Sequence, residues 1–208
     1  MNAMKYILGI DIGTTNIKAA AFDEGGRMAA YHAVPTPILH PSANMHEFEP
    51  EAIWRCVCDC IASVAKAVGG SNVITLGISS MAETGIPVDH LNMPLYNFIA
   101  WYDMRSQPQC DKLCEQLGAR QIYDITGQIP SGKYGIAKLM WLKQHAPSAY
   151  RRMRRWLSME DYIIYRLTGC IATDYSVAAR TMAFDIHAFR WSSTILDAAG
   201  IDERIQDI

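Results

Sequence analysis

Residues 6–23 read Tyr-Ile-Leu-Gly-Ile-Asp-Ile-Gly-Thr-Thr-Asn-Ile-Lys-Ala-Ala-Ala-Phe-Asp. The short apolar run Tyr6–Ile10 is typical of a buried β-strand, and a second apolar run, Ile17–Phe22, predicts another. Between the runs lie an aspartate, a glycine and two threonines. The stretch therefore predicts two strands joined in a hairpin whose tip carries a carboxylate, a flexible glycine and two hydroxyls.

The hairpin tip has the residue types that bind a nucleotide phosphate and its metal ion. Gly13 lets the backbone approach a ligand closely, and the hydroxyls of Thr14 and Thr15, with nearby N–H groups, can cradle phosphate oxygens. Asp11 can hold Mg²⁺, which prefers a carboxylate or two together with phosphates and water. Lys18 adds a positive charge for a phosphate. The alternative is an ordinary hairpin turn, in which aspartate and glycine are common for conformational reasons alone.

The composition is that of a globular protein and argues against some partners. The chain has 208 residues, of which 50% are hydrophobic and 19% charged, enough for one large domain or two small ones. Its net charge of −2 gives no electrostatic footprint for nucleic acid. No apolar run approaches a membrane span in length, and the first apolar run is broken by Asp11, unlike a signal peptide. We therefore expect a cytoplasmic protein that binds neither nucleic acid nor membrane.

The cysteines are expected to be reduced thiols, because the chain shows no export signal. The segment Cys56-Val57-Cys58-Asp59-Cys60 has closely spaced cysteines, as a metal-binding motif does. In a helix, however, Cys56 and Cys60 share one face and Cys58 points away from them. The spacing therefore argues against a zinc site. The six cysteines are Cys56, Cys58, Cys60, Cys110, Cys114 and Cys170.

The elements that follow the hairpin predict a mixed sheet with a crossover helix. A third strand, Met28–Val34, would complete an antiparallel meander, and residues 35–50 are expected to form a loop. Pro50–Val68 is predicted to be a helix, with a proline in its first turn and Gly69-Gly70 after its last. The apolar run Val73–Ser80 predicts the next strand, and a strand–helix–strand order favours a right-handed crossover onto the same sheet.

The second half of the chain is expected to be mainly helical. A short strand is predicted at Ile86–Asp89 and a loop at Gln128–Tyr134. The basic run at 151–155 is read as a solvated helix end, with a polyanion site as the alternative. Asp174 and Arg180 are expected to form an ion pair. Helices are predicted over 106–117, 136–145, from 147, over 158–167 and over 191–199.

Six motifs occur in a recognisable order along the chain. They are Gly9-Ile10-Asp11-Ile12-Gly13-Thr14-Thr15, Phe48-Glu49-Pro50-Glu51-Ala52-Ile53-Trp54, Gly77-Ile78-Ser79-Ser80, Ala100-Trp101-Tyr102-Asp103-Met104-Arg105, Ala137-Lys138-Leu139-Met140-Trp141-Leu142, and the block from Thr173 to Met182. With these motifs the chain resembles the N-terminal domain of the FGGY carbohydrate kinases. The resemblance covers nearly the whole chain, although the hairpin by itself is shared with actin, hexokinase and heat-shock chaperones. It implies an α/β fold of the ribonuclease H-like, actin-like type, with a mixed central sheet flanked by helices.

The resemblance implies an ATP- and Mg²⁺-dependent kinase that phosphorylates a hydroxyl of a small sugar, polyol or sugar acid. Residues 1–208 would form the N-terminal, sugar-binding domain. The nucleotide-binding domain and the Gly-Asp-Gln segment, whose Asp is the family's general base, are expected beyond residue 208, so this chain alone should be inactive. Dimers are common in the family, which makes a homodimer conceivable. The alternative is a non-catalytic actin-like domain that binds a sugar or a partner protein.

The resemblance also assigns site residues. Asp11 would organise Mg²⁺ and the transferring phosphoryl group, with Gly13, Thr14 and Thr15 around the phosphates. In the segment Met81-Ala82-Glu83, Ala82 replaces an arginine that binds glycerol in glycerol kinases, and no histidine follows Met81 as it does in xylulokinases. Both departures argue against those two substrates, while Glu83 keeps its capacity to accept hydrogen bonds from hydroxyls. The other residues implied to bind substrate are Trp101, Asp103, Arg105, Lys133 and Tyr134.

Several of these residues have structural alternatives. Glu83 could cap a turn, Trp101 could belong to the core, and Asp103 could pair with Arg105. Lys138 could contact a phosphate or simply pack on its helix.

Overall fold

The structure is a computed structural model that describes residues 4–202. The chain divides into two compact units, and each is described by itself. The first comprises the residues up to Ile38 together with Glu49–Met81. The second comprises Leu39–Phe48 together with the residues from Ala82 onward.

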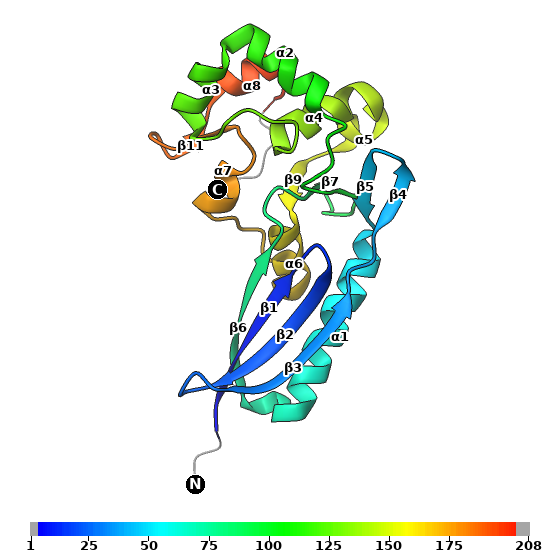
Figure 1. Cartoon of the computed structure of the whole chain (residues 1–208), viewed down its shortest axis with the longest axis vertical. Helices are drawn as coiled ribbons and strands as arrows, with labels where there is room; N and C mark the ends of the chain where they lie inside the picture. Colours follow the sequence, from blue (N-terminus) through cyan, green and yellow to red (C-terminus); the bar gives the residue numbers. More distant parts are fainter. Residues whose placement is uncertain (1–3, 203–208) are drawn as a thin grey trace. The chain divides into compact units, whose positions relative to one another are not determined.

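The first unit is built on a four-stranded sheet of order β3-β2-β1-β6 (Figure 1). Strands β1 (Tyr6–Ile12), β2 (Asn16–Asp23) and β3 (Met28–Pro35) form the antiparallel meander that the sequence predicts. Strand β6 (Val73–Ser80) pairs with β1 in parallel, so the predicted crossover onto the same sheet is confirmed.

Helix α1 (Pro50–Val68) makes this crossover and ends at Gly69, which has φ 78°. Its N-terminus is capped by the Glu49 carboxylate, which accepts hydrogen bonds from the N–H groups of Glu51 and Ala52 and complements the helix dipole. A short 3₁₀ turn, η1 (Gly70–Asn72), leads into β6. The helix packs on the sheet through its buried residues Ile53, Val57, Cys60 and Val64, against Leu8, Ile10, Ile12 and Ile17.

The cysteine run lies on this helix, as the sequence predicts. Cys60 is buried and its Sγ lies 3.5 Å from the carbonyl oxygen of Ile17, while Cys56 and Cys58 are partly buried. Within residues 4–202, no three His, Cys, Asp or Glu side chains gather closely enough to hold a metal ion.

The second unit contains a five-stranded sheet of order β4-β5-β8-β7-β9. The prediction of a loop over residues 35–50 is wrong, because β4 (Leu39–Ser42) and β5 (Met45–Phe48) form a hairpin there. Strand β5 is held by pairing with β8 (Phe98–Ile99), and β7 (Gly85–Val88) pairs with both β8 and β9 (Arg155–Ser158). Such distant pairing leaves no local periodicity in a sequence rich in Pro, His and Asn.

Helices make up the rest of the second unit, and α4 is its most buried helix. Helix α4 buries apolar side chains on nearly all sides and also buries Lys138 completely. The predicted Ser158 cap and the glycine ends at Gly169 and Gly200 are confirmed. The elements are α2 (Gln107–Leu117), α3 (Ala119–Thr126), α4 (Gly135–His145), α5 (Pro147–Arg152), α6 (Met159–Thr168), α7 (Tyr175–Ala179), β10 (Phe184–Asp185), β11 (Arg190–Trp191) and α8 (Ser193–Ala199).

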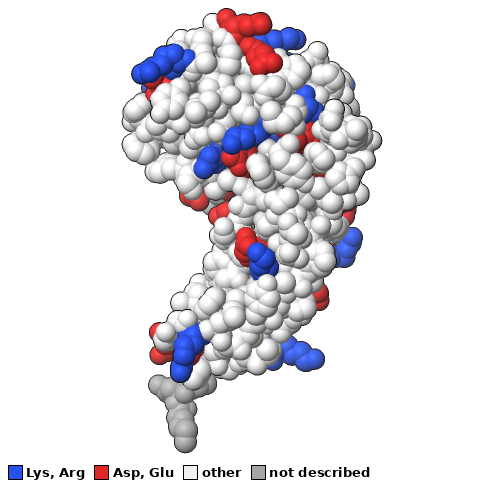
Figure 2. Space-filling model, in the orientation of Figure 1, with Lys and Arg blue, Asp and Glu red and all other residues white. Residues whose placement is uncertain are grey.

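The surface carries charges of both signs in small groups, as Figure 2 shows for one face. The basic run begins at the end of α5, where Arg151 and Arg152 form the last turn, and passes through the buried Met153 to Arg155 in β9. Across residues 4–202, every helix is too short or too polar to cross a bilayer.

Gly85 leaves the space in which the Trp156 ring packs, and we expect Gly85→Ala to destabilise the second unit. A Cβ at Gly85 would overlap the Trp156 ring, whereas a Cβ at Gly77 on β6 would meet no atom within 4 Å. Overpacking of this kind costs about 1–3 kcal/mol. Urea unfolding followed by tryptophan fluorescence should show this loss for Gly85→Ala and none for the control Gly77→Ala. Equal midpoints for the two variants would contradict the expectation.

Candidate functional site

The predicted phosphate-binding hairpin tip lies in the first unit and is a fixed turn. The Gly13 N–H donates to the Asn16 carbonyl at 3.1 Å, which closes the turn between β1 and β2. Thr36 holds the turn from the side: its Oγ1 donates to the Gly13 carbonyl at 2.7 Å and its N–H to the Thr15 carbonyl at 3.0 Å. Sequence analysis missed Thr36, because nothing in its local pattern connects it with a turn more than twenty residues earlier.

Asp11 stands beside this turn with an accessible carboxylate. It lies opposite Lys18 in the β1–β2 register, and the Lys18 Nζ is 3.0 Å from Asp11 Oδ2. The two side chains are 51% and 41% exposed, so both can reach a ligand. The hydrogen bond from Lys18 to Asp11 and the charge of Asp11 raise the pKa of Lys18, which keeps its positive charge at this position.

The donor set around Asp11 suits Mg²⁺ rather than a metal that needs a cage of protein ligands. A Cβ at Gly13 would lie 3.0 Å from the Asn16 carbonyl oxygen and 3.8 Å from Asp11 Oδ2, so glycine leaves the space beside the carboxylate open. Mg²⁺ is commonly held by a single carboxylate together with phosphate oxygens and water. The residues at the tip therefore fit a magnesium–phosphate group, for which Asp11 would supply the carboxylate and Thr14 and Thr15 lie at the turn.

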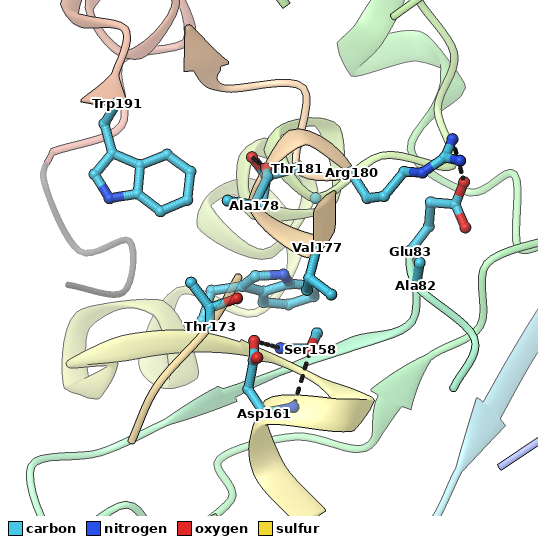
Figure 3. Close-up of a pocket in the computed structure, with 12 residues that line it drawn as sticks. Ala82, Glu83, Ser158, Asp161, Thr173, Val177, Ala178, Arg180, Thr181 and Trp191 are labelled. Carbon is cyan, nitrogen blue, oxygen red and sulfur yellow. Dashed lines mark hydrogen bonds and ion pairs between the residues drawn. The ribbon is translucent and has the colours of Figure 1, made fainter. Parts of the chain in front are cut away.

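Met81 also belongs to the first unit and is 8% exposed, whereas the other predicted substrate residues lie in the second unit. Among these, Glu83 is placed between two cations. Its Oε1 is 3.7 Å from the Lys133 Nζ. The same oxygen is 3.6 Å from Arg180 Nη1, and Figure 3 shows this second contact. Both distances exceed that of a direct hydrogen bond, so the three charges face one another without tight pairing. Counted together, these three side chains carry one net positive charge.

Arg180 is a site residue that the sequence assigned elsewhere. The predicted ion pair of Asp174 with Arg180 is wrong, because the Asp174 carboxylate caps α7 and accepts hydrogen bonds from the N–H groups of Ser176 and Val177. The signal for a cap was present, since aspartate is a favoured N-cap residue and Asp174 precedes Tyr175-Ser176-Val177. Arg180 follows α7 directly, and its guanidinium lies beside the Glu83 carboxylate.

A small cavity adjoins Glu83. Its volume is about 20 Å³, which is enough for one water molecule and too small for a sugar. A sugar held by Glu83 would therefore lie outside this cavity, on the side of the half-exposed Lys133 and Arg180. Figure 3 shows the lining, which is Ala82, Glu83, Gly135, Trp156, Ser158, Asp161, Thr173, Val177, Ala178, Arg180, Thr181 and Trp191.

Trp101 is 39% exposed and so is not a core residue. Its backbone N–H donates to Thr84 Oγ1 at 3.0 Å, and Thr84 is fully buried. The bond connects the segment that carries Trp101 with the segment that carries Glu83. Each segment carries a side chain that the family resemblance assigns to substrate: Trp101, which is 39% exposed, and Glu83, whose side chain is 13% exposed.

Asp103 and Arg105 form the buried ion pair that was the structural alternative. Arg105 Nη2 lies 2.7 Å from Asp103 Oδ2, and Arg105 Nη1 lies 2.7 Å from Glu47 Oε1. The three side chains are at most 3% exposed, and the Arg105 guanidinium also lies over the Trp141 ring at 4.9 Å. Their polar atoms are engaged within the protein, so substrate contact by Asp103 and Arg105 stays a prediction.

Hydrogen bonds decide the charge of this buried pair. Burial alone would raise the pKa of Asp103, but the hydrogen bonds from the Arg105 side chain and the His46 N–H outweigh burial and lower it. Burial opposes the charge of Arg105 as well, yet its bonds to Asp103 and Glu47 raise its pKa above the ordinary value. Both groups therefore stay charged inside the second unit.

Lys133 and Tyr134 differ in their access to a ligand. Tyr134 is 4% exposed, and its hydroxyl donates to Gln128 Oε1 at 2.8 Å. The Lys133 Nζ lies over the Tyr134 ring at 5.0 Å, and its side chain is 32% exposed. Of the two predicted residues, Lys133 is the one that can reach a substrate.

Glu160 makes the stability of the second unit depend on pH. Burial, with the nearby charges of Asp174 and Asp161, raises its pKa to about 7. The folded state then holds a proton that the unfolded state loses above about pH 4.5, so this group costs stability as the pH rises toward 7. We expect Glu160→Gln to gain about 1–2 kcal/mol at pH 8, allowing for partial solvent screening, and nothing at pH 4. Thermal unfolding at both pH values tests this, with the exposed Glu115→Gln as control; equal gains at pH 4 and pH 8 would contradict it.

The chain matches known proteins over nearly its whole length. The N-terminal domain of the FGGY family of carbohydrate kinases matches residues 6–206. A xylulose kinase of Lactococcus lactis is 32% identical over 205 residues, which are 97% of this chain and 40% of that protein. A glycerol kinase of Coxiella burnetii is 32% identical over 201 residues, which are 92% of this chain and 40% of that protein.

The fold agrees with these matches. A crystal structure of a gluconate kinase from Lactobacillus acidophilus superposes with a TM-score of 0.92 at 28% identity, covering 99% of this chain and 42% of that one. The predicted mixed α/β architecture of the actin-like type is thereby confirmed. The chain spans about two fifths of the length of these relatives. It belongs to the FGGY family of carbohydrate kinases, whose N-terminal domain it matches.

Proposed function

We propose that the natural protein containing this chain is an ATP- and Mg²⁺-dependent kinase that transfers a phosphoryl group to a hydroxyl of a small sugar, polyol or sugar acid. The observation that carries the proposal is the pairing of an accessible Asp11 with Lys18 beside the Gly13 turn, in a chain that matches the FGGY N-terminal domain. The relatives named above are xylulose, glycerol and gluconate kinases, and this chain supplies the part that corresponds to their first two fifths.

The residues of this chain would work mainly by positioning and by charge. Asp11 would hold Mg²⁺, which neutralises charge on the phosphates when it is bound. Thr14 and Thr15 would cradle phosphate oxygens, and Lys18 would offset the remaining negative charge. The substrate hydroxyl attacks the terminal phosphorus, ADP leaves, and the hydroxyl proton passes to a general-base Asp that we expect beyond residue 208.

Glu83 would orient the sugar, because a carboxylate can accept hydrogen bonds from two hydroxyls at once. Lys133 and Arg180 would set the charge that the substrate meets. Ala82 and the absence of a histidine after Met81 argue against glycerol and xylulose, which leaves other ketoses and sugar acids. The net positive charge of Glu83, Lys133 and Arg180 favours a sugar acid among them. We also place the protein in the cytoplasm and keep the homodimer as an expectation.

The direct test is sugar-dependent ADP release by the natural protein, with a panel of ketopentoses, ketohexoses, polyols and sugar acids. We expect turnover with one class, and with D-gluconate or a similar sugar acid before a neutral ketose. Turnover with a neutral sugar instead of a sugar acid would refute the argument from the net positive charge, but the proposal of a kinase would stand. If no sugar gives turnover and none shifts the melting temperature, the kinase proposal fails and a non-catalytic binding domain takes its place.

Glu83→Gln should raise the KM for that sugar by roughly 10–100-fold, because a hydrogen bond to a charged group contributes roughly 1.5–3 kcal/mol. The KM for ATP should stay within about twofold, since Glu83 is assigned to the sugar alone. Steady-state kinetics with each substrate varied in turn measures both values. The exposed Glu115→Gln on α2 is the matched control, and equal KM values for the two variants would remove Glu83 from the site.

A further inference from the structure

Lys138 is a lysine without access to solvent in the middle of α4. Its side chain is completely buried, and its Nζ donates to three backbone carbonyl oxygens: Glu83 at 2.6 Å, Ala100 at 3.0 Å and Ile99 at 3.3 Å. An ammonium group has three donors and no acceptor. The three carbonyls therefore match the charged form of Lys138 donor for donor.

A lysine in such a place is costly, so its presence requires a reason. Burial lowers the pKa of Lys138 to about 7, against the charges of Asp103 and Glu83, which raise it, while Arg105 lowers it further. Apolar residues of similar volume would fill the same space in α4 without desolvating a charge. An apolar residue has no donors, so it could not bond to the three carbonyl groups and hold the two segments together.

Those two segments carry the side chains that the proposed function needs. Glu83 lies in the turn between β6 and β7. Ile99 is the last residue of β8, and Ala100 follows it immediately before Trp101. The Trp101 N–H also donates to Thr84 Oγ1 at 3.0 Å, which joins the same two segments a second time. Lys138 thus fixes the backbone directly beneath Glu83 and Trp101.

We propose that Lys138 is a positioning residue, which sets the sugar-facing placement of Glu83 and Trp101 through the backbone and touches neither sugar nor nucleotide. The part of this inference that concerns sugar rests on the proposed function. It differs from both alternatives that the sequence left open: a completely buried Nζ cannot reach a phosphate, and its three hydrogen bonds to backbone carbonyls are more than packing on a helix.

Lys138→Met in the natural protein removes the donors and keeps the length of the side chain. Without the ammonium the segments at 83–84 and 99–102 should loosen, and misplacement of substrate-orienting groups by about 1 Å costs roughly 10²-fold in kcat/KM. We expect this loss in the kcat/KM for the sugar, whereas the KM for ATP should stay within about twofold of the wild type. Lys143→Met on the same helix is the control, since the Nζ of Lys143 donates to the Gly200 carbonyl away from these segments.

Hydrogen exchange gives a second readout that needs no sugar. In Lys138→Met, amide exchange should quicken at 83–84 and 99–102 and stay unchanged in α6 and α8. If no sugar is turned over by the wild type, the proposed function fails, yet this exchange pattern still decides whether Lys138 fixes the two segments.

Two results would overturn the inference. One is an unchanged exchange pattern and an unchanged kcat/KM in Lys138→Met. The other is faster exchange throughout the second unit in both Lys138→Met and Lys138→Gln, or failure of both variants to fold, which would make Lys138 a residue of general stability. The glutamine variant is included because its amide keeps two donors and should lose less sugar kcat/KM than the methionine variant.

Discussion

Asp11→Asn should reduce kcat for sugar phosphorylation by roughly 10³-fold, because it removes the carboxylate that we assign to Mg²⁺ and preorganised charge is the main source of rate in phosphoryl transfer. Asparagine keeps the size of the side chain and the β1–β2 pairing with Lys18. The Asp11 side chain is 51% exposed, so the fold should tolerate the change. The measurement is ADP release at saturating sugar and ATP by the natural protein that contains this chain.

The matched control is Asp59→Asn. Asp59 is a 62% exposed carboxylate on α1 whose Oδ2 lies 3.6 Å from the His32 Nε2, and its loss should leave kcat unchanged. Sugar binding by Asp11→Asn, followed by calorimetry, should also persist, because Glu83, which we assign to the sugar, lies in the second unit. A kcat for Asp11→Asn within tenfold of the wild type would remove Asp11 from the proposed mechanism.

The elements that the sequence predicts well are those with a strong local pattern. The β1–β2 hairpin, helix α1 and strand β6 each combine an apolar period with a clear end, such as Gly69 after α1. The Ser158 cap belongs to the same class, because a capping box is a local signature. For these elements the boundaries from pattern and from structure agree to within about two residues.

The elements that escape prediction depend on distant partners. The local sequence of β5 predicts a loop, but Glu47 and Phe48 pair with Ile99 and Phe98 on β8 and form a strand. Strand β9 likewise depends on its pairing with β7. The same holds in the site. Arg180 and Glu83 are almost a hundred residues apart in the chain, and the sequence offered the nearer Asp174 as a partner instead.

The resemblance of the motifs does not predict which side chains within a motif are exposed and which are buried. The segment from Ala100 to Arg105 contains two exposed side chains, Trp101 and Met104, and a buried pair, Asp103 and Arg105. Exposure decides which of these can touch a ligand, and exposure depends on packing from Glu47 and Trp141, which no spacing rule connects with the motif.

Breaking the buried Arg105 network should destabilise the second unit more than any other single change discussed above. Arg105→Met leaves the carboxylates of Asp103 and Glu47 buried without their cation, and removal of one partner from a buried pair costs roughly 3–5 kcal/mol. Urea unfolding at pH 7 should show this loss. The control is Arg120→Met, because Arg120 pairs with Asp124 at 2.9 Å on the surface and is 85% exposed, and its midpoint should not move.

The pH dependence of unfolding separates the network from a mere loss of packing at Arg105. In the wild type the lowered pKa of Asp103 means that the unfolded state binds more protons near the ordinary pKa of 3.8, so stability rises with pH through that range. In Arg105→Met the side-chain hydrogen bonds and the charge of Arg105 are lost, while the backbone N–H bonds from His46 and from residue 105 remain, so burial is opposed less strongly and the pKa of Asp103 rises relative to the wild type. The folded variant then takes up a proton at a higher pH than the folded wild type, and this uptake offsets part of its loss of stability as the pH falls. The deficit of Arg105→Met should therefore shrink toward pH 4, whereas a packing defect would leave the same deficit at both pH values and would contradict the assigned role of the pair.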